Sequence, residues 1–320
     1  MLKFVFLPPI DANQREWARR LEAALPEFDV RVIEHEEEVK QAVSTADAAY
    51  GWVPPEALAT ARNLRWLQNP YAGPFVGYYY AELAEHPVTV TNPRGIYSDH
   101  ISHHILMFML ALSRGLPYWF DAQRKADWNP RARQHGYVDI ASSTVLINGV
   151  GGIGTETARL CAAMGARVIG IDPRTASIPE AEIHAPDELD DLLPTADFVI
   201  TTVPHTPETE LMWNRDRFIN MKSTAYFINV GRGMTASLDD LVVALEKREL
   251  AGAGLDVFET EPLPPDHRLW SMENVLITPH IAVADAVNIS ERRYEILLDN
   301  AQRFAQDKEL RNVVDKSLWY

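Results

Sequence analysis

Three residues in the C-terminal half of the chain combine the chemistry needed to bind an anion and move a proton: Arg232, Glu261 and His280. Each follows a short apolar run that predicts a buried strand. In an open α/β sheet, ligands bind outside the carboxyl ends of the strands, so these side chains are expected to converge on one crevice. Arginine binds carboxylates, and histidine exchanges protons near neutral pH. The trio therefore predicts a proton-coupled reaction on an anionic substrate.

A glycine-rich segment follows an earlier predicted strand and opens a helix. Its G-x-G-x-x-G spacing lets the backbone turn tightly and approach a pyrophosphate at the helix N-terminus. Asp172 closes the next predicted strand, where a carboxylate accepts hydrogen bonds from a ribose. The predicted dinucleotide site comprises Gly149, Gly151, Gly152, Ile153, Gly154 and Asp172.

Asp172 also bears on the choice of cofactor. A carboxylate at this position repels the 2′-phosphate of NADP, so the sequence favours NAD. Arg174 lies two residues further along and is placed to turn toward a phosphate, so NADP remains open.

Elements that position these residues alternate between strands and helices, which predicts an α/β class with parallel sheets. Strands are expected at Lys3–Leu7, Val30–Ile33, Ala48–Trp52, Trp66–Gln68 and Val88–Thr91, and then at Val145–Val150, Val168–Ile171, Phe198–Val203, Tyr226–Val230, Gly252–Val257 and Val275–Thr278. Long helices are expected at 98–125, 237–250 and 288–306. We expect a substrate domain at 1–97, completed by 288–320, and a dinucleotide-binding domain at 98–287.

Composition narrows the function further. The chain has 320 residues, of which 47% are hydrophobic, and a formal net charge of −15. Such a field repels nucleic acids and any anionic substrate, so a site for an anion must concentrate positive charge locally. The longest apolar run is too short to cross a bilayer, and Cys161 is the only cysteine. A cytoplasmic enzyme with neither membrane nor nucleic-acid partners is expected.

The ordered motifs resemble those of the D-isomer-specific 2-hydroxyacid dehydrogenases. The resemblance is strong from about Val145 to Ala282 and looser in the first domain. It rests on the glycine segment with Asp172 and on four further segments: Val203-Pro-His-Thr-Pro-Glu-Thr209, Ile228-Asn-Val-Gly-Arg-Gly233, Ala253-Gly-Leu-Asp-Val-Phe-Glu-Thr-Glu-Pro262 and Thr278-Pro-His280.

The resemblance implies two doubly wound parallel-sheet domains, one flavodoxin-like for substrate and one of the Rossmann type for NAD or NADP. It implies reduction of a small 2-keto acid to a D-2-hydroxy acid. His280 would protonate the substrate oxygen, Glu261 would orient the imidazole, and Arg232 would bind the carboxylate. It adds Pro173, Arg174, Val203, Pro204, Thr209, Val230, Gly231 and Asp256 to the cofactor site, and Tyr71, Ala72 and Gly73 to the substrate site.

The sequence departs from the family pattern in the first domain. Pro74 has no N–H to offer a substrate carboxylate. Four tyrosines are candidates to replace that donor, although packing is the simpler interpretation for most of them: Tyr71, Tyr78, Tyr79 and Tyr80. The size of the keto acid therefore stays open between a glyoxylate or hydroxypyruvate and a larger acid.

Several histidines outside the trio need an interpretation. His100 and His104 share a helix face and His103 lies beside them, but no nearby carboxylate or cysteine completes a metal shell. We expect packing or hydrogen bonding there, and no metal. His205 is the alternative catalytic base to His280.

One alternative function remains. A non-catalytic, NAD(H)-sensing binding protein of the corepressor type keeps similar motifs.

The segment from Ser98 bears on the oligomeric state. A helix that is apolar on nearly every face must be covered, so this segment predicts a homodimer.

Overall fold

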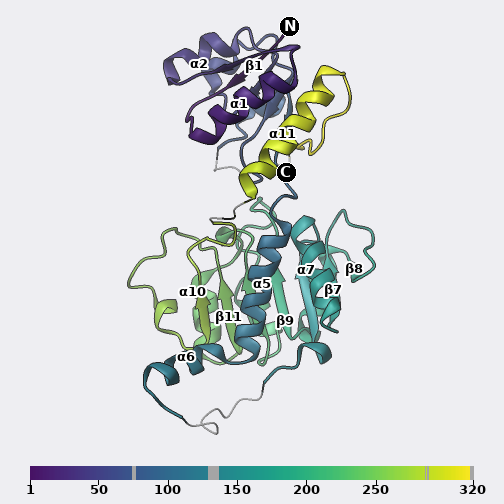
Figure 1. Cartoon of the computed structure of the whole chain (residues 1–320). Coiled ribbons are helices and arrows are strands. Elements are labelled where there is room, and N and C mark those ends of the chain that lie inside the picture. Colours follow the sequence, from purple (N-terminus) through teal and green to yellow (C-terminus); the bar gives the residue numbers. More distant parts are fainter. Residues whose placement is uncertain (74–76, 129–136, 285, 287, 318–320) are drawn as a thin grey trace. The chain divides into compact units, whose positions relative to one another are not determined.

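The computed structural model describes residues 1–73, 77–128, 137–284, 286 and 288–317. The chain divides into two compact units, and Figure 1 colours both along the sequence. Unit 1 comprises residues 1–96 and 287–320, and unit 2 comprises residues 97–286. The first unit is therefore built from both ends of the chain.

Unit 1 is organised around a parallel five-stranded sheet with the order β2-β1-β3-β4-β5, which flavodoxin-like folds share. Its strands are β1 (Leu2–Phe6), β2 (Phe28–Val32), β3 (Ala48–Tyr50), β4 (Trp66–Gln68) and β5 (Thr89–Thr91). Its helices are α1 (Ala12–Ala24), α2 (Glu36–Val43), α3 (Pro55–Leu58), α4 (Ala81–Glu85) and α11 (Ile289–Ala305). Successive β1 side chains alternate between two cores: Phe4 and Phe6 face α1 and α11, and Val5 faces α2 to α4.

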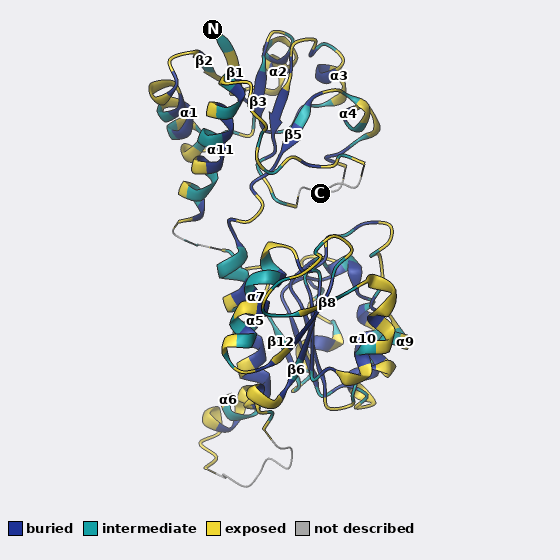
Figure 2. Ribbon diagram, turned by 90° about the vertical axis from the view of Figure 1, so that its right-hand side faces the viewer, coloured by how far each residue is buried: buried dark blue, intermediate teal, exposed yellow. Residues whose placement is uncertain are grey.

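Helix α11 brings the C-terminal part of the chain back to unit 1, beside α1 (Figure 2). Tyr294, Leu297, Ala301 and Phe304 recur at the spacing of one helix face and are buried. The ring of Phe304 lies 5.5 Å from that of Trp66, which belongs to the central sheet. The predicted C-terminal helix thus forms part of the core of the first unit.

Unit 2 contains a parallel seven-stranded sheet with the order β12-β11-β10-β9-β6-β7-β8. Its strands are β6 (Thr144–Asn148), β7 (Arg167–Ile171), β8 (Glu182–His184), β9 (Phe198–Thr201), β10 (Tyr226–Asn229), β11 (Gly252–Leu255) and β12 (Val275–Ile277). From β8 to β11 the order is that of a Rossmann sheet, which β12 extends by one strand. The predicted fold class is confirmed in both units.

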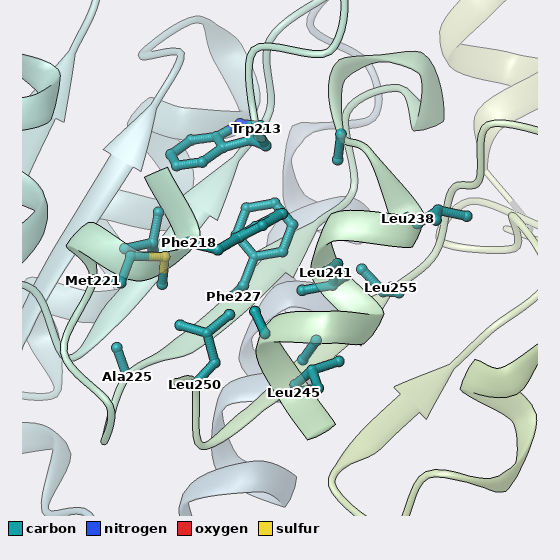
Figure 3. Close-up of a cluster of buried hydrophobic side chains, with 14 of the residues drawn as sticks. Trp213, Phe218, Met221, Ala225, Phe227, Leu238, Leu241, Leu245, Leu250 and Leu255 are labelled. Carbon is teal, nitrogen blue, oxygen red and sulfur yellow. The ribbon is translucent and has the colours of Figure 1, made fainter. Parts of the chain in front are cut away.

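Helices cover both faces of the unit 2 sheet. They are α5 (Ser98–Ser113), α6 (Leu116–Arg124), α7 (Gly152–Ala163), α8 (Leu189–Leu192), α9 (Arg215–Asn220) and α10 (Leu238–Glu246). Figure 2 shows α5 and α7 on one face and α9 and α10 on the other. On the second face, Phe227 packs its ring 5.1 Å from that of Trp213 and 5.2 Å from that of Phe218 (Figure 3). This core is fully buried and anchors β10, whose end carries Arg232.

The structure contains a strand that the sequence analysis did not predict. Strand β8 is three residues long, lies at the sheet edge and is only half-buried. An edge strand with polar Glu182 and His184 lacks the continuous apolar run by which buried parallel strands are recognised.

The single long helix expected at 98–125 is also wrong. Helix α5 ends at Ser113 and α6 begins at Leu116, because Gly115 adopts φ +64° and Pro117 follows in the first turn of α6. A left-handed residue reverses the direction of the helical backbone, and proline is tolerated only at a helix start. The apolar segment therefore forms two helices.

In the described part of the chain, no helix has both the length and the hydropathy needed to span a bilayer. Over those same residues, no three His, Cys, Asp or Glu side chains are grouped as metal ligands would be.

Candidate active site

The three candidate catalytic residues lie on loops that leave neighbouring strands. Arg232 follows β10, Glu261 follows β11 and His280 follows β12. These strands pair in parallel, with Asn229 opposite Leu255 and Leu255 opposite Ile277. Their carboxyl ends therefore open at the same edge of the sheet, as the sequence predicts.

His280 and Glu261 form a direct pair. His280 Nδ1 lies 2.8 Å from Glu261 Oε2, and both side chains are partly exposed. The other carboxylate oxygen of Glu261 accepts a hydrogen bond of 3.0 Å from the backbone N–H of Phe258, which fixes its direction. An ionised carboxylate can only accept, so Nδ1 donates to it and Nε2 is left to face a substrate. The arrangement suits a proton donor held in one orientation.

Arg232 supplies a desolvated positive charge beside this pair. Burial lowers the pKa of its guanidinium, and the nearby Glu261 carboxylate opposes the shift. Arginine nevertheless stays cationic in proteins. One of its nitrogens, Nη1, donates 2.7 Å to the Gly231 carbonyl, which turns the side chain back toward its own loop. A half-buried guanidinium with donors to spare attracts an anion more strongly than a fully exposed one.

The glycine segment forms the strand-to-helix turn that the sequence predicts. Gly149 adopts φ +100°, and a side chain on Gly154 would meet the Gly149 carbonyl oxygen at 2.0 Å. These two positions therefore require glycine for the protein's own packing. A side chain on Gly151, by contrast, would meet no protein atom within 4 Å. The open side of Gly151, at the N-terminus of α7, fits a pyrophosphate approaching the backbone.

Asp172 joins the glycine turn to the loop after β7. Its Oδ2 accepts from Val150 N at 2.9 Å, and its Oδ1 accepts from Arg174 N and Thr175 N, each at 2.8 Å. Burial acts to raise the pKa of Asp172, but these backbone donors outweigh it and leave the pKa lowered. The carboxylate is thus ionised, and Oδ2 keeps one lone pair for a ribose hydroxyl. Thr175, absent from the predicted set, adds a hydroxyl bond of 2.9 Å to the Val150 carbonyl.

The remaining predicted cofactor residues lie on loops at the same sheet edge. Val203 and Pro204 follow β9, and Val230 and Gly231 follow β10. A side chain on Gly231 would meet the Val203 carbonyl oxygen at 2.7 Å, so these two loops are in contact. Thr209 accepts from Thr206 N at 2.8 Å and donates to the Pro204 carbonyl at 2.7 Å, which closes the turn between them.

Asp256, like Asp172, uses its carboxylate to bond to protein groups, but it is almost fully buried. It is 1% exposed and accepts from Thr278 Oγ1, Ile281 N and Ala282 N. His104 Nε2 lies 2.8 Å from Thr278 Oγ1. Neither His104 nor Thr278 was predicted to take part in the site. Their signals in the sequence were a hydroxyl two residues before His280 and a histidine on an apolar helix.

The predicted substrate loop belongs to unit 1. The side chain of Asn69 at the end of β4 accepts from Tyr71 N at 2.9 Å, and the Ala72 carbonyl accepts from Asn92 Nδ2 at 3.3 Å. Gly73 follows these residues, and Pro74 lies outside the described residues.

The neighbouring tyrosines use their hydroxyls within unit 1. Tyr78 donates to the Gly51 carbonyl and Tyr80 to the Val53 carbonyl, each at 2.7 Å. The hydroxyl of Tyr79 accepts from Asn69 Nδ2 at 3.2 Å. These bonds agree with the packing role that the sequence analysis preferred.

His205 and His104 have partners other than Glu261, which pairs with His280. His205 Nε2 is 3.8 Å from Glu210 Oε2, beyond hydrogen-bond distance. His104 is directed toward Thr278 and Asp256. Of the histidines considered for catalysis, His280 is the one with the carboxylate partner that orients a proton donor.

Comparisons with known proteins agree with this geometry. A family model described as "D-isomer specific 2-hydroxyacid dehydrogenase, NAD binding domain" matches residues 106–282. The chain is 30% identical to a glyoxylate reductase of Pyrococcus furiosus over 308 residues, which cover 91% of this chain and 90% of that protein.

Solved structures resemble the whole chain. One is a D-isomer specific 2-hydroxyacid dehydrogenase from Xanthobacter autotrophicus in complex with NADPH, with 29% identity, a TM-score of 0.84 and 99% coverage of both chains. Another is an NADPH-dependent glyoxylate/hydroxypyruvate reductase from Sinorhizobium meliloti, with 27% identity, a TM-score of 0.82 and full coverage of both chains.

Two glycine variants separate packing from cofactor binding. We expect Gly151→Ala to keep the wild-type Tm while weakening NADH and NADPH binding about tenfold or more, because its methyl group enters space that only the pyrophosphate would use. Gly154→Ala should lower Tm, because its methyl group clashes with the Gly149 backbone. Thermal unfolding and fluorescence titration of both cofactors measure the two effects. Wild-type affinity in Gly151→Ala would contradict this placement of the pyrophosphate.

Proposed function

This chain belongs to the D-isomer specific 2-hydroxyacid dehydrogenase family, and we propose that His280, Glu261 and Arg232 carry out its reduction of a 2-keto acid. The enzyme is an NAD(P)-dependent oxidoreductase. The observation that carries the assignment of residues is the 2.8 Å contact between His280 Nδ1 and Glu261 Oε2, at the sheet edge that also presents Arg232.

Each residue has one task in this proposal. The glycine turn and Asp172 would hold a reduced nicotinamide dinucleotide, which would supply the hydride for the carbonyl carbon of the keto acid. His280 transfers its Nε2 proton to the carbonyl oxygen. This oxygen becomes the hydroxyl group of the product, a D-2-hydroxy acid. Glu261 holds the ring through Nδ1 and stabilises the imidazolium before the transfer.

Arg232 binds the substrate carboxylate and stabilises the negative charge that develops on the carbonyl oxygen. Its partial burial makes this attraction strong enough to overcome the average field of a chain with a formal net charge of −15. Tyr71, Ala72 and Gly73 of unit 1 are the proposed further contacts with the substrate.

Small keto acids of the glyoxylate or hydroxypyruvate type are the proposed substrates. Support comes from relatives named glyoxylate reductase and glyoxylate/hydroxypyruvate reductase. A relative named probable 2-ketogluconate reductase, 29% identical over 254 residues, keeps a larger keto acid as the second candidate. None of these names supports the alternative of a non-catalytic NAD(H) sensor.

A substrate panel combined with two histidine variants tests the assignment. NADH and NADPH oxidation should be fastest with one of glyoxylate, hydroxypyruvate, pyruvate, phenylpyruvate and 2-ketogluconate. With that acid, His280→Asn should reduce kcat about 10²- to 10⁴-fold, the usual contribution of a general acid. His205→Ala is the matched control and should keep most of the turnover. If turnover survived in His280→Asn but not in His205→Ala, the assignment would be wrong.

We also propose that NAD is preferred over NADP. The Asp172 carboxylate is negative because the three backbone N–H groups that bond to it lower its pKa. A 2′-phosphate beside it would meet like-charge repulsion, whereas a ribose hydroxyl can use the free lone pair on Oδ2. Two structural relatives were solved with NADPH or NADP, so the proposed preference for NAD would distinguish this chain from them and can be measured.

Asp172→Asn removes the negative charge of this residue. The amide keeps Oδ1 as the acceptor for Arg174 N and Thr175 N, but its Nδ2 cannot accept from Val150 N, so the Tm of the variant is measured as well. We expect the ratio of kcat/KM for NADPH over NADH to rise about tenfold, or about 1.4 kcal/mol. The single variant Arg174→Gln should leave kcat/KM for NADH unchanged. The proposed preference would be wrong if the wild-type protein preferred NADPH and Arg174→Gln abolished that preference.

A homodimer is the proposed assembly. Large apolar side chains are exposed on α5 and α6 and just beyond them, namely Met107, Leu110, Leu116, Phe120 and Trp128. Phe120 is 53% exposed and Trp128 is 96% exposed. Soluble proteins seldom leave so many large apolar groups uncovered together, and a second copy offers the same apolar surface in return.

Sedimentation velocity tests the dimer. Wild-type protein should sediment at twice the 36.1 kDa chain mass, and Phe120→Glu should shift it to the monomer because a charge cannot be buried unpaired. Ile219→Glu on α9 is the control, because Ile219 is similarly exposed on the other face of the sheet. A monomeric wild type would exclude the proposal.

A further inference from the structure

A buried chain of hydrogen bonds links helix α5 to the loop that carries His280. His104 Nε2 lies 2.8 Å from Thr278 Oγ1, which lies 2.6 Å from Asp256 Oδ1. The side chain of His104 is 12% exposed and that of Asp256 is 2% exposed. All three residues belong to unit 2, on three different elements of the fold.

The direction of each bond follows from the number of protons available. Thr278 has one hydroxyl proton and gives it to the Asp256 carboxylate. The Thr278 oxygen must therefore accept from His104, so His104 Nε2 carries a hydrogen. Burial lowers the pKa of His104, with Asp256 opposing the shift, which keeps the ring neutral near pH 7. The ring of Phe108 packs edge-on at 4.8 Å and helps to fix the ring plane.

At the other end of this hydrogen-bond network, Asp256 holds the backbone just after His280 and the side chain of Thr278 just before it. Asp256 Oδ1 accepts from Ile281 N at 2.9 Å, and Oδ2 accepts from Ala282 N at 3.1 Å. His280 itself adopts φ +54°, a left-handed conformation that costs a side-chain-bearing residue about 1–2 kcal/mol. Such a conformation persists only where its surroundings impose it.

We propose that His104 and Thr278 are positioning residues that act through Asp256 to hold residues 278–282 in the conformation that places His280 against Glu261. The proposal rests on the proposed role of His280 and extends it to a residue on α5. It assigns to His104 the supply of one hydrogen bond, with neither metal binding nor proton transfer to substrate. Asp256 then acts mainly on the protein backbone.

Thr278→Val tests the proposal because valine keeps the shape of threonine and removes the hydroxyl. We expect kcat to fall about 10- to 100-fold, because a small misplacement of a catalytic group has effects of this size. The Kd for NADH should stay within about twofold, since an intact glycine turn and Asp172 bind the cofactor. Thr278→Ser keeps the hydroxyl and should restore most of kcat.

The histidine end has its own matched pair. His104→Gln retains an N–H donor that can reach Thr278, and His104→Phe fills the space without one. We expect Gln to keep substantially more turnover than Phe. The double variant His104→Phe with Thr278→Val should lose no more kcat than Thr278→Val alone, because both substitutions break the same chain.

Three measurements separate positioning from general stability. Thermal unfolding gives the Tm of each variant, steady-state kinetics separates kcat from KM, and single-turnover mixing gives the rate of hydride transfer. Wild-type kcat in Thr278→Val would overturn the proposal. So would equal losses of kcat and Tm in the Val and Ser variants, which would mean that packing alone matters. Because His280→Asn is assayed separately, normal turnover in Thr278→Val beside an inactive His280→Asn would sink this proposal and leave the role of His280 intact.

Discussion

Parallel pairing of β10, β11 and β12 is the constraint on which the rest of the candidate site depends. Register places Asn229, Leu255 and Ile277 side by side, so the three loops that follow leave the sheet at one edge. An arginine and a glutamate 29 positions apart, and a histidine 19 positions further along, are thereby brought to one sheet edge. The aromatic core beneath β10 packs this strand against the rest of the unit (Figure 3), and sites carried by well-packed elements hold the geometry that a reaction needs.

Two aspartates, the half-buried Asp172 and the buried Asp256, serve this sheet edge in the same way. Asp172 gathers three backbone N–H groups around the cofactor turn, and Asp256 gathers two backbone N–H groups and a hydroxyl around the His280 loop. Loops at strand ends leave N–H groups without sheet partners, and buried donors must be satisfied. A carboxylate accepts several of them at once with charge-assisted strength. Some carboxylates of this acidic chain therefore fix the backbone of loops, in addition to those that lie at the protein surface.

Positive charge is used more sparingly. The chain has 45 acidic and 30 basic residues, and many of its arginines pair with carboxylates at the surface, as Arg15 does with Glu34 and Arg167 with Glu182. Arg232 is different because its guanidinium is partly desolvated and interacts electrostatically with the Glu261 carboxylate. Desolvation strengthens its field over a short range, where an anionic substrate would feel it more than the net charge of the protein.

The sequence alone determined the α/β class, most strands, the glycine turn and the strand-end positions of Arg232, Glu261 and His280, because these depend on local patterns of apolar runs, glycines and strand-end residues. It did not reveal β8, whose short polar edge carries no such pattern, or the break between α5 and α6, which depends on a left-handed Gly115. Only the tertiary structure decided that Asp256 bonds to the His280 loop and that His104 reaches it through Thr278. Those contacts join residues more than 20 positions apart, up to 174 between His104 and Thr278, and such distances are set by how helices and strands pack, which no local pattern encodes.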